Sequence, residues 1–335
     1  MINKETMAII KNKTVLVTGG AGFIGSNIID RLLIQENKVI CLDNFSTGKR
    51  ENIAQHQSHP DFDLIEGDIR NLNTCHSACK GVDIVLHQAA LGSVPRSIND
   101  PITTNDVNVS GFLNMLVAAR DAGVNRFVYA ASSSTYGDSK ELPKVEEVIG
   151  QPLSPYAVTK YVNELYASVF ARTYNMQLIG LRYFNVFGPR QDPNGAYAAV
   201  IPLFVKALIL KQSPKINGDG SFSRDFTYVA NVIQANERAA TIENPEAINN
   251  VYNVACGERT SLNELVSLLK EFLSSYDGSI AQVNTEYGPQ RAGDVPHSLA
   301  TIDKAARLLH YQPTHLFKEG LQEAISWYWK SFGEA

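Results

Sequence analysis

The chain has 335 residues, of which 44% are hydrophobic and 19% charged, a composition typical of a globular protein with a large buried core. This length exceeds that of one ordinary core and indicates about two domains. The formal net charge of −4 argues against a broad nucleic-acid-binding or anionic-membrane-binding surface. Any phosphate site must therefore be a local one.

No stretch approaches the roughly 20 apolar residues that a membrane-spanning helix needs. The most apolar segment, 198–210, is short and contains Pro202 and Lys206. The first residues, MINKETMAIIKNK, lack the apolar core and cleavage site of a signal peptide. We therefore expect a cytoplasmic protein without a membrane segment.

Four cysteines are present, at Cys41, Cys75, Cys79 and Cys256. Cys75 and Cys79 have helical spacing with His76 between them, which fits either part of a metal site or ordinary thiols of a reduced compartment. A structural zinc needs four ligands and no second pair is visible, so we expect no metal.

Short apolar runs alternate with helical patterns through the first half of the chain. The predicted strands are Thr14–Gly19, Lys38–Asp43, Phe62–Asp68, Asp83–Ala90, Arg126–Ser132 and Gln177–Tyr183. The helical patterns cover Gly22–Gln35, Leu72–Cys79, Val107–Ala122 and Tyr156–Tyr174. Buried strands that alternate with helices predict an α/β fold with a parallel sheet covered on both faces.

The alternation weakens after Tyr183. Loop signals cluster at Gly188–Gly195 and Asn217–Ser223, and helical patterns return at Leu262–Leu273, Asp303–Leu309 and Phe317–Lys330. No long linker separates the halves, so we expect two closely packed domains. Residues 1–182 plus about 227–258 would form the first, and about 183–226 plus 259–335 a smaller α/β C-terminal domain that covers the substrate.

A glycine-rich loop joins the first strand to the first helix. Gly19 permits the tight turn, Gly22 lets the backbone approach a pyrophosphate, and Gly25 lets the helix pack on the strand. The helix N-terminus offers free N–H groups and the positive end of its dipole to phosphates. A glycine triplet alone is weak evidence, but here strand, helix and a second strand ending in an acid all fit. The loop therefore predicts a Rossmann-type, doubly wound dinucleotide domain.

Asp43, at the end of the second strand, bears on the choice of cofactor. Its carboxylate would accept hydrogen bonds from the adenosine ribose and repel a 2′-phosphate, which favours NAD over NADP. The plainer alternative is a set of turn glycines followed by a solvent-exposed aspartate.

Tyr156 and Lys160 lie four residues apart and share one face of a predicted helix. A phenol with a pKa of about 10 is a poor base at neutral pH, but the Lys160 charge and a positive nicotinamide would favour its phenolate. Such a pair would accept a proton from a sugar hydroxyl while hydride leaves the same carbon. The spacing alone also fits a surface helix pair; Ser132–Ser134, which end the fifth strand, favour the catalytic interpretation.

Together, TGGAGFIG, Asp43, Ser132 and the Tyr156/Lys160 pair resemble an extended short-chain dehydrogenase/reductase over essentially the whole chain. Longer stretches are similar to the nucleotide-sugar 4-epimerases of that family, most of all to the bacterial UDP-N-acetylglucosamine 4-epimerases of surface-polysaccharide pathways. These stretches are HQAALGSVPRSINDP from His87, AASSSTYGD from Ala130, LSPYAVTKYVNELYA from Leu153, LRYFNVFGPRQDPNGAYAAVIP from Leu181 and INGDGSFSRDF from Ile216.

The resemblance implies roles for individual residues. Tyr156 would be the base, Lys160 would lower its pKa and bind the nicotinamide ribose, and Ser132 would hydrogen-bond the reacting oxygen. Besides Tyr156 and Lys160, the NAD-binding residues would be Gly19, Gly22, Phe23, Ile24, Gly25, Asp43, Asn44, Ser46, Gly48, Asp68, Ile69, Gln88, Ala89, Ala90, Asn108 and Tyr183.

A UDP-sugar is the implied substrate. Asn185, Arg224 and Arg291 would hold its diphosphate, Ala199 and Val200 would pack the uracil, and Asp294 would bind the nucleotide ribose. The full implied set is Ser93, Ser132, Ser133, Ser134, Asn185, Gln191, Ala199, Val200, Asn217, Arg224, Arg291, Asp294 and Ser298.

Two serines bear on the reaction. The related sugar dehydratases carry an Asp-Glu pair before the tyrosine that follows strand five, and the related decarboxylases keep the Glu. Here Ser133 and Ser134 precede Tyr136. A hydroxyl without an activating neighbour cannot do that proton work at neutral pH. This leaves epimerisation at carbon 4, in which hydride passes to NAD and returns to the other face of the ketone without net redox change.

Ser298 bears on the sugar. In UDP-galactose epimerases of the enterobacterial type the equivalent position is a tyrosine that crowds carbon 2, whereas a serine leaves room for an N-acetyl group. We therefore expect interconversion of UDP-N-acetylglucosamine and UDP-N-acetylgalactosamine, with weaker action on UDP-glucose and UDP-galactose. The plainer alternative is an uninvolved loop serine.

Other possibilities stay open. The uronate, UDP-N-acetylglucosaminuronate, is an alternative substrate, with Ser93 or Arg96 as donors to its carboxylate. A non-catalytic NAD-binding sensor and a dehydrogenase that releases NADH are the contrasting classes. The resemblance also implies a homodimer through helices near Val107–Ala122 and Tyr156–Tyr174, although their apolar faces fit a sheet-facing core equally well.

Overall fold

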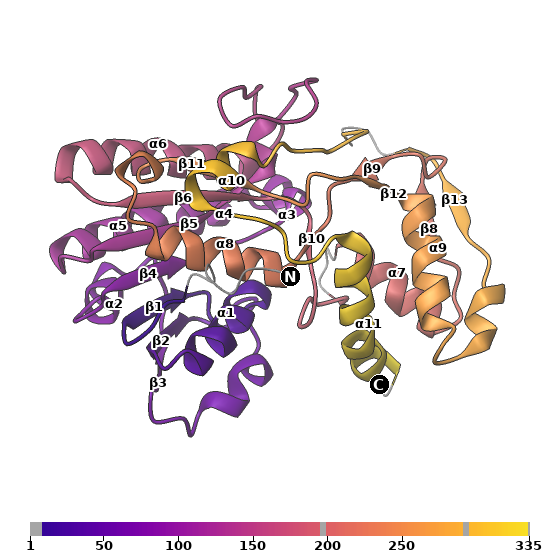
Figure 1. Ribbon diagram of the computed structural model, residues 1–335, viewed down its shortest axis with the longest axis horizontal. Helices are drawn as coiled ribbons and strands as arrows, with labels where there is room; N and C mark the ends of the chain where they lie inside the picture. Colours follow the sequence, from indigo (N-terminus) through magenta and orange to yellow (C-terminus); the bar gives the residue numbers. More distant parts are fainter. Residues whose placement is uncertain (1–8, 195–198, 291–294, 334–335) are drawn as a thin grey trace.

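The computed structural model describes residues 9–194, 199–290 and 295–333. A seven-stranded parallel sheet forms the middle of its larger part, on the left in Figure 1. The strands run in the order β11-β6-β5-β4-β1-β2-β3. They are β1 (Thr14–Thr18), β2 (Lys38–Asp43), β3 (Phe62–Glu66), β4 (Ile84–His87), β5 (Arg126–Ser132), β6 (Leu178–Tyr183) and β11 (Val251–Val254). This order is that of a doubly wound dinucleotide-binding sheet, which confirms the predicted fold class.

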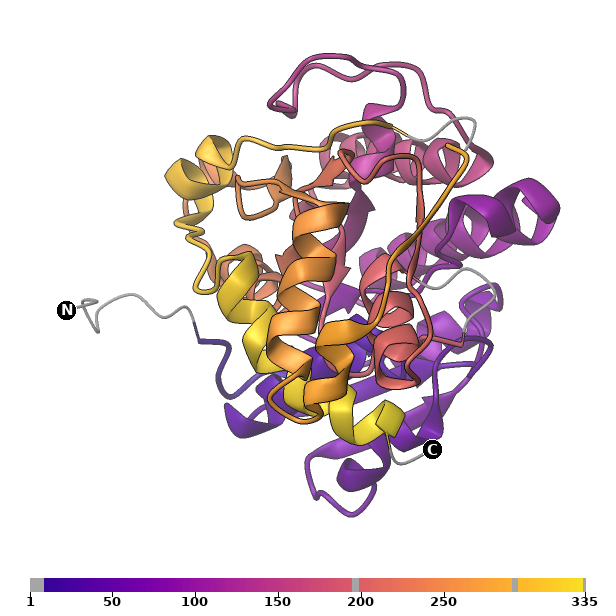
Figure 2. The same cartoon turned by 90° about the vertical axis from the view of Figure 1, so that its right-hand side faces the viewer.

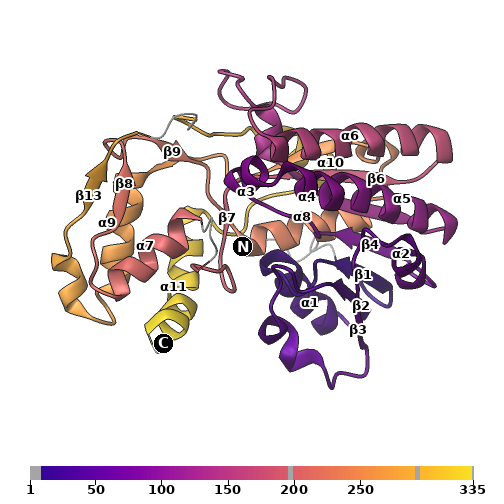
Figure 3. The ribbon, with the colours of Figure 1, turned by 180° about the vertical axis from the view of Figure 1, so that it is seen from behind.

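Helices cover both faces of the sheet, because the strands are apolar on both sides. On one face lie α1 (Phe23–Ile34), α8 (Val229–Thr241) and α10 (Asp303–Leu309), which share one apolar core with the strands. On the other face α2 (Leu72–Ala78), α5 (Phe112–Asp121) and α6 (Pro155–Tyr174) form a second core, seen from behind in Figure 3.

Three features of this half differ from the sequence-based expectation. β4 ends at His87, so residues 88–92 leave the sheet. β11 is a further parallel strand that had not been predicted. The helix expected at Val107 begins earlier, because α3 (Val94–Asn99) and α4 (Pro101–Asn105) precede a π-helical segment, Asp106–Gly111, that continues into α5. Both short helices begin at a capping residue followed by proline, a start signal that the sequence contains.

A smaller unit stands beside the sheet and faces the viewer in Figure 2. Its helices are α7 (Val200–Ile209), α9 (Leu262–Leu273) and α11 (Phe317–Gly333), which enclose a separate apolar core. Its short strands pair as β7 (Val186–Phe187) with β10 (Thr227–Tyr228), β8 (Lys215–Asn217) with β13 (Glu286–Gly288), and β9 (Ser223–Arg224) with β12 (Thr260–Ser261).

We propose two domains close to those expected from the sequence, with one refinement. α10 belongs to a stretch assigned to the smaller domain, yet Ala305, Leu308 and Leu309 pack on the sheet beside α1 and α8. Across the described ranges, no helix combines the length and apolar character that crossing a membrane requires.

Candidate active site

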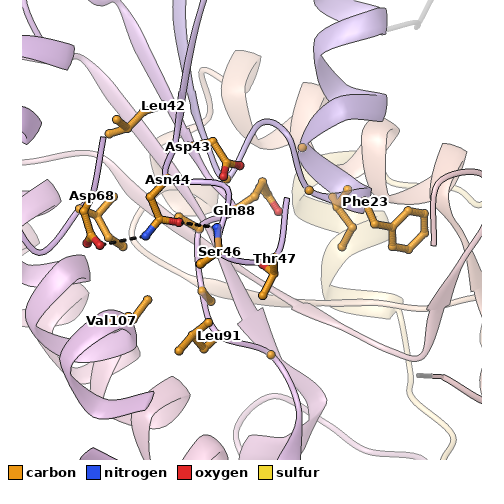
Figure 4. A pocket seen from close by; sticks show the side chains of 18 of the residues that line it. Phe23, Leu42, Asp43, Asn44, Ser46, Thr47, Asp68, Gln88, Leu91 and Val107 are labelled. Carbon is orange, nitrogen blue, oxygen red and sulfur yellow. Dashed lines mark hydrogen bonds between the residues drawn. The ribbon is translucent and has the colours of Figure 1, made fainter. Parts of the chain in front are cut away.

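A cavity of about 300 Å³ opens at the carboxyl ends of β1, β2 and β4, where the strand order reverses (Figure 4). Ligands of doubly wound sheets bind at this position. Most residues expected to bind the dinucleotide line it, namely Gly19, Gly22, Phe23, Ile24, Gly25, Asp43, Asn44, Ser46, Asp68, Ile69, Gln88, Ala89 and Ala90. Leu42, Thr47, Gly67, Leu91, Gly92 and Val107 also line it and had not been predicted.

The glycine loop has the close contacts that its sequence predicts. Gly19 has φ +66°, and a Cβ atom there would lie 2.8 Å from the Ala89 backbone. A Cβ atom on Gly25 would lie 2.2 Å from the Gly19 carbonyl oxygen. α1 begins after Gly22, which has no side chain to cap the first turn. These residues therefore fit the pyrophosphate of a dinucleotide, which the helix N-terminus would receive.

Asp43 lies at the end of β2, and both of its carboxylate oxygens are already oriented by the backbone. Ala21 N–H donates to Oδ2 at 2.9 Å and Phe45 N–H to Oδ1 at 2.8 Å. Burial raises the pKa of this carboxyl, and the two backbone donors oppose that shift. Each oxygen retains a lone pair for a ribose hydroxyl. Gly48 does not line the cavity but packs here, since a Cβ atom on it would lie 2.9 Å from both oxygens.

The cations that follow Asp43 in the chain are engaged by carboxylates. Lys49 Nζ lies 3.4 Å from Asp192 Oδ2, and Arg50 donates to Glu66 at 2.6 Å. Pairing of this kind suits an unphosphorylated ribose better than a 2′-phosphate, which needs cations of its own.

Asn44 is fixed at the adenosine side of the cavity. Its amide donates to Asp68 Oδ2 at 2.9 Å and accepts from Ser46 N–H at 3.0 Å, as Figure 4 shows. The Arg70 guanidinium beside Asp68 lowers the pKa of that carboxyl to about 2, so it stays ionised at neutral pH.

A second cavity, of about 250 Å³, continues from the first and shares Ile24, Gln88, Ala90 and Gly92 with it. It is lined by Ser132, Tyr156, Lys160, Tyr183 and Asn185 among others. The predicted catalytic group is thus brought together next to the dinucleotide cavity.

The sequence places Tyr156 in the first turn of α6. Ser154 caps this helix by accepting a hydrogen bond from Ala157 N–H at 3.1 Å, and Pro155 occupies its first position. Lys160 follows one turn later on the same face, with Nζ 6.0 Å from the centre of the Tyr156 ring.

Burial dominates the electrostatics of this pair. Burial raises the pKa of the Tyr156 phenol, and a hydrogen bond with the Ser132 side chain offsets this only in part. Lys160, whose pKa burial lowers to about 8, donates to the Ala130 carbonyl at 2.8 Å. The raised pKa keeps the phenol protonated at neutral pH, so positive charge nearby, from Lys160 and from a bound nicotinamide, would be needed to favour the phenolate.

Tyr183 belongs to a closed ring of buried hydrogen bonds. Its hydroxyl donates to Gln88 Oε1 at 3.1 Å and accepts from Asn236 Nδ2 at 2.9 Å, while Gln88 Nε2 donates to Asn236 Oδ1 at 3.1 Å. Asn236 was not predicted, although a polar residue on the apolar face of α8 is a signal that the sequence contains. Asn108, also predicted to contact the cofactor, is hydrogen-bonded to the backbone of Leu91 in the loop after β4.

A third cavity, of about 300 Å³, lies against the smaller domain and shares Asn185 and Val186 with the second. Of the predicted substrate residues it contains Asn185, Gln191, Ala199, Val200, Asn217 and Arg224. Lys215, Phe222 and Phe226 also line it and had not been singled out. The three cavities therefore adjoin in a row, with Tyr156 and Lys160 at the middle one.

Several predicted substrate residues lie elsewhere. Ser93 caps α3 and has φ +105°, and Ser133 and Ser134 begin a 3-10 helix after β5. Ser298 N–H donates to the Ser223 carbonyl at 3.0 Å, one residue before Arg224. None of these four side chains is among the described residues that line the three cavities. Arg291 and Asp294 fall outside the described residues.

No Asp or Glu is among the described residues that line the middle cavity. The cysteines are buried free thiols, and Cys75 donates to the Ile69 carbonyl at 3.1 Å. Within residues 9–194, 199–290 and 295–333, no three His, Cys, Asp or Glu side chains gather as a metal site would require.

Fold and site together define a nicotinamide-dinucleotide protein with a Ser/Tyr/Lys group beside a second binding cavity. Residues 15–255 match the model of the NAD dependent epimerase/dehydratase family. The chain is 34% identical over 315 residues to the UDP-glucose 4-epimerase of Mycolicibacterium smegmatis, covering 93% of this chain and 97% of the relative.

Two solved structures are similar along almost their whole length. A UDP-N-acetylglucosamine 4-epimerase from Methanobrevibacter ruminantium, in complex with UDP-N-acetylmuramic acid, is 38% identical with a TM-score of 0.89, over 96% of this chain and 100% of that one. The UDP-glucuronic acid 4-epimerase from Bacillus cereus, in complex with UDP-glucuronic acid and NAD, is 29% identical with a TM-score of 0.86, over 95% and 99%. The chain belongs to the NAD dependent epimerase/dehydratase family, and NAD is its cofactor.

Proposed function

We propose that this protein is a UDP-sugar 4-epimerase and that UDP-N-acetylglucosamine and UDP-N-acetylgalactosamine are its substrate pair, used for surface polysaccharide. One observation carries the proposal. The cavity with Ser132, Tyr156 and Lys160 joins the dinucleotide cavity to one that contains Asn185 and Arg224.

The residues of the middle cavity would handle the proton of the sugar 4-hydroxyl. Ser132, already hydrogen-bonded to Tyr156, would hold that oxygen, and Tyr156 would take its proton. NAD, when bound, supplies the acceptor and donor of the hydride of carbon 4. Tyr156 would return the proton after the ketone has presented its other face, so that protons and electrons balance over one turnover.

The third cavity would hold the nucleotide while the sugar turns. Arg224 supplies a cation and Asn185 an amide, both suited to a diphosphate, and Asn185 is oriented by its hydrogen bond to the Asp225 carbonyl at 3.0 Å. Apolar side chains of Val200, Phe222 and Phe226 offer packing for the base.

Elimination and decarboxylation are disfavoured by the side chains that follow β5. Ser134 Oγ donates to Ser132 Oγ at 2.9 Å. Ser134 therefore orients Ser132, the serine beside Tyr156, and is not itself placed as an acid or base. No carboxylate lines the middle cavity among its described residues, and a hydroxyl alone cannot act as the second acid or base.

The N-acetylated pair is favoured over the alternatives by Ser298 and by the similarity to the UDP-N-acetylglucosamine 4-epimerase of Methanobrevibacter. The uronate stays the second candidate, since the Bacillus relative acts on a uronic acid. A sensor has no need for a tyrosine, a lysine and a serine gathered between two binding cavities. An NADH-releasing dehydrogenase could use the same three groups, and it differs from an epimerase in releasing NADH in step with product.

The substrate is tested by incubating the holoenzyme separately with UDP-N-acetylglucosamine, UDP-glucose and UDP-N-acetylglucosaminuronate, and by following the anomeric protons by NMR. We expect fastest conversion of the first to its 4-epimer, with no stoichiometric NADH absorbance. Conversion of the uronate alone would replace the proposed substrate, and NADH released in step with product would reject epimerisation.

Ser298→Tyr tests the sugar pocket. Ser298 lines none of the three cavities, but its backbone is bonded to Ser223, next to Arg224 of the third cavity, so a phenol here would extend toward the substrate. We expect kcat/KM for UDP-N-acetylglucosamine to fall by about 10- to 100-fold, with UDP-glucose affected severalfold at most. Steady-state rates on both sugars measure this. Equal losses on the two substrates would remove Ser298 from the specificity argument.

A further inference from the structure

The turn Gly188–Gln191, between β7 and α7, is fastened to the helix that begins at the phosphate loop. Arg190 Nη2 donates to Asp30 Oδ2 at 2.6 Å, and Asn27 Nδ2 donates to the Pro189 carbonyl at 3.1 Å. Both Asn27 and Asp30 lie on α1. Two successive residues of the smaller domain are thus bonded to one face of the dinucleotide-binding helix.

The Asp30 carboxylate is also held by a hydrogen bond to His56. His56, at the end of the 3-10 helix Arg50–His56, places Nε2 2.6 Å from Asp30 Oδ1, so each carboxylate oxygen has its own partner. The side chains of Arg190, Asp30 and His56 are 19%, 32% and 14% exposed. Shielding of this degree makes the ion pair stronger than one on an open surface.

The backbone conformation of the turn is one that needs support from side-chain contacts. Arg190 has φ +71°, a left-handed conformation that residues with a side chain seldom adopt. The contacts of its guanidinium and of Pro189 with α1 are the interactions that hold this conformation.

The turn borders the third cavity and is bonded to the helix that begins at the dinucleotide cavity. Gln191, the next residue, lines the third cavity, and its Nε2 donates to the Val186 carbonyl at 2.9 Å. Val186 lines both the second and third cavities. At the other end of the connection, Phe23 and Gly25 at the start of α1 line the dinucleotide cavity.

We propose that Arg190 and Asp30 are positioning residues that set the wall of the sugar-nucleotide cavity against the dinucleotide-binding helix. Neither side chain is among the described residues that line the three cavities, so both would act through Gln191 and Val186. The inference rests on the proposed function only in taking the third cavity as the UDP-binding one; the fastening of the turn itself does not depend on it.

The test compares the holoenzyme with its Arg190→Gln, Asp30→Asn and double variants. Losing the pair frees the turn, so we expect the KM for the sugar nucleotide and the Kd of UDP to rise about fivefold to tenfold, with kcat within about twofold. The double variant should bind UDP no more weakly than either single variant, because both substitutions remove the same ion pair. Arg190→Lys, which keeps the charge but not the planar fork, should recover part of the affinity.

A purely structural role would instead lower the active fraction, and hence kcat, at an unchanged KM. The matched control is Asp192→Asn, because Asp192 lies on the same loop but pairs with Lys49 in a more exposed bridge at 3.4 Å. Its UDP affinity should stay within about twofold of the parent.

Amide hydrogen exchange of peptides spanning 186–192 gives a readout that needs no substrate. Faster exchange in Arg190→Gln and Asp30→Asn, with NAD content and thermal midpoint preserved, supports the proposal even if the parent protein fails to epimerise any UDP-sugar. Unchanged exchange and unchanged UDP affinity in both variants would overturn it, whatever the activity of the parent.

Discussion

Burial acts on Tyr156 and Lys160 in opposite senses, and both shifts disfavour the charged forms. The pKa of the phenol rises and that of the ammonium falls to about 8. In the protein alone, the proton therefore stays on the tyrosine at neutral pH. In the proposed mechanism the cofactor's positive charge would therefore help to form the phenolate, and proton uptake by Tyr156 would be tied to the oxidised state of NAD.

Tyr156→Phe removes the only atom of this side chain that takes up a proton. The variant should fold and retain NAD, because the ring that fills the cavity is kept, while turnover falls by about 10²- to 10⁴-fold. Coupled assays of epimer formation measure the loss of turnover, and the NAD released on denaturation measures cofactor retention.

Tyr161→Phe is the control for this substitution, since Tyr161 follows on the same helix but lines none of the three cavities. Its activity should match the parent. Residual epimerisation above about a tenth of the parent rate in Tyr156→Phe would reject the assigned base.

At the scale of elements, Asp225 joins the segments around β9 and β11. Its carboxylate accepts hydrogen bonds from the N–H groups of Cys256, Gly257 and Ala300, at 2.9, 3.2 and 3.3 Å. Burial nevertheless raises the pKa of Asp225 to about 7, because desolvation outweighs the three donors.

This shift predicts a pH-dependent stability. Between pH 4 and 7 the folded protein holds a proton on Asp225 that the unfolded chain, with its ordinary pKa of 3.8, has released. The free energy of unfolding should therefore fall as pH rises through this window, by up to about 1.4 kcal/mol per unit, and level off above pH 7.

Asp225→Asn cannot titrate, so the difference in unfolding free energy between parent and variant isolates the effect. Urea unfolding at pH 5, 6, 7 and 8 measures it. The difference should shrink as pH rises to 7 and then stay constant; parallel curves across the whole range would show that Asp225 is ionised throughout.

The elements that the sequence predicts best are those in which local pattern and tertiary role agree. The strands β1, β2 and β5, the glycine loop and the start of α6 each have a strong local signal. β11 was missed because its four residues, Val251–Val254, are too few to show a period. Asn236, Arg190 and Asp30 were missed because their roles arise from contacts more than 50 residues away along the chain.

The place of a residue around the cofactor cavity also depends on contacts that are distant along the chain. Gly48 and Asn108, predicted to contact NAD, lie against Asp43 and the Leu91 loop and are not among the described residues that line the dinucleotide cavity. Sequence similarity identifies that a residue matters near a site, but it does not separate a residue that lines a cavity from one that holds the lining in place.

At the scale of the whole molecule, we propose that the predicted homodimer forms through an exposed apolar face of α6. Ala167 and Phe170 of α6 pack on the sheet, while Val158, Leu165 and Val169 lie along another stripe with exposures of 48%, 49% and 45%. Apolar residues at this spacing form a face available to a second copy.

Val169→Glu would place a charge in that face. If two copies meet there, light scattering after gel filtration should change from about twice the chain mass to a single chain, at micromolar concentration. The control is Ile34→Glu, since Ile34 is 76% exposed on α1, away from this stripe. A dimer that survives Val169→Glu, or a parent that is monomeric, would reject this surface.

The return of the chain to the sheet after building the smaller domain has a consequence for biosynthesis. β6 ends at Tyr183, but the strand that covers its outer edge begins at Val251, and α10 begins only at Asp303. In a nascent polypeptide that has emerged only as far as β6, the outer edge of β6 is therefore unpaired and the sheet face that α8 and α10 cover is exposed. Both surfaces favour self-association. A fragment ending near residue 182 should aggregate rather than fold, and the nucleotide half of this protein has to wait for its own C-terminal third to leave the ribosome.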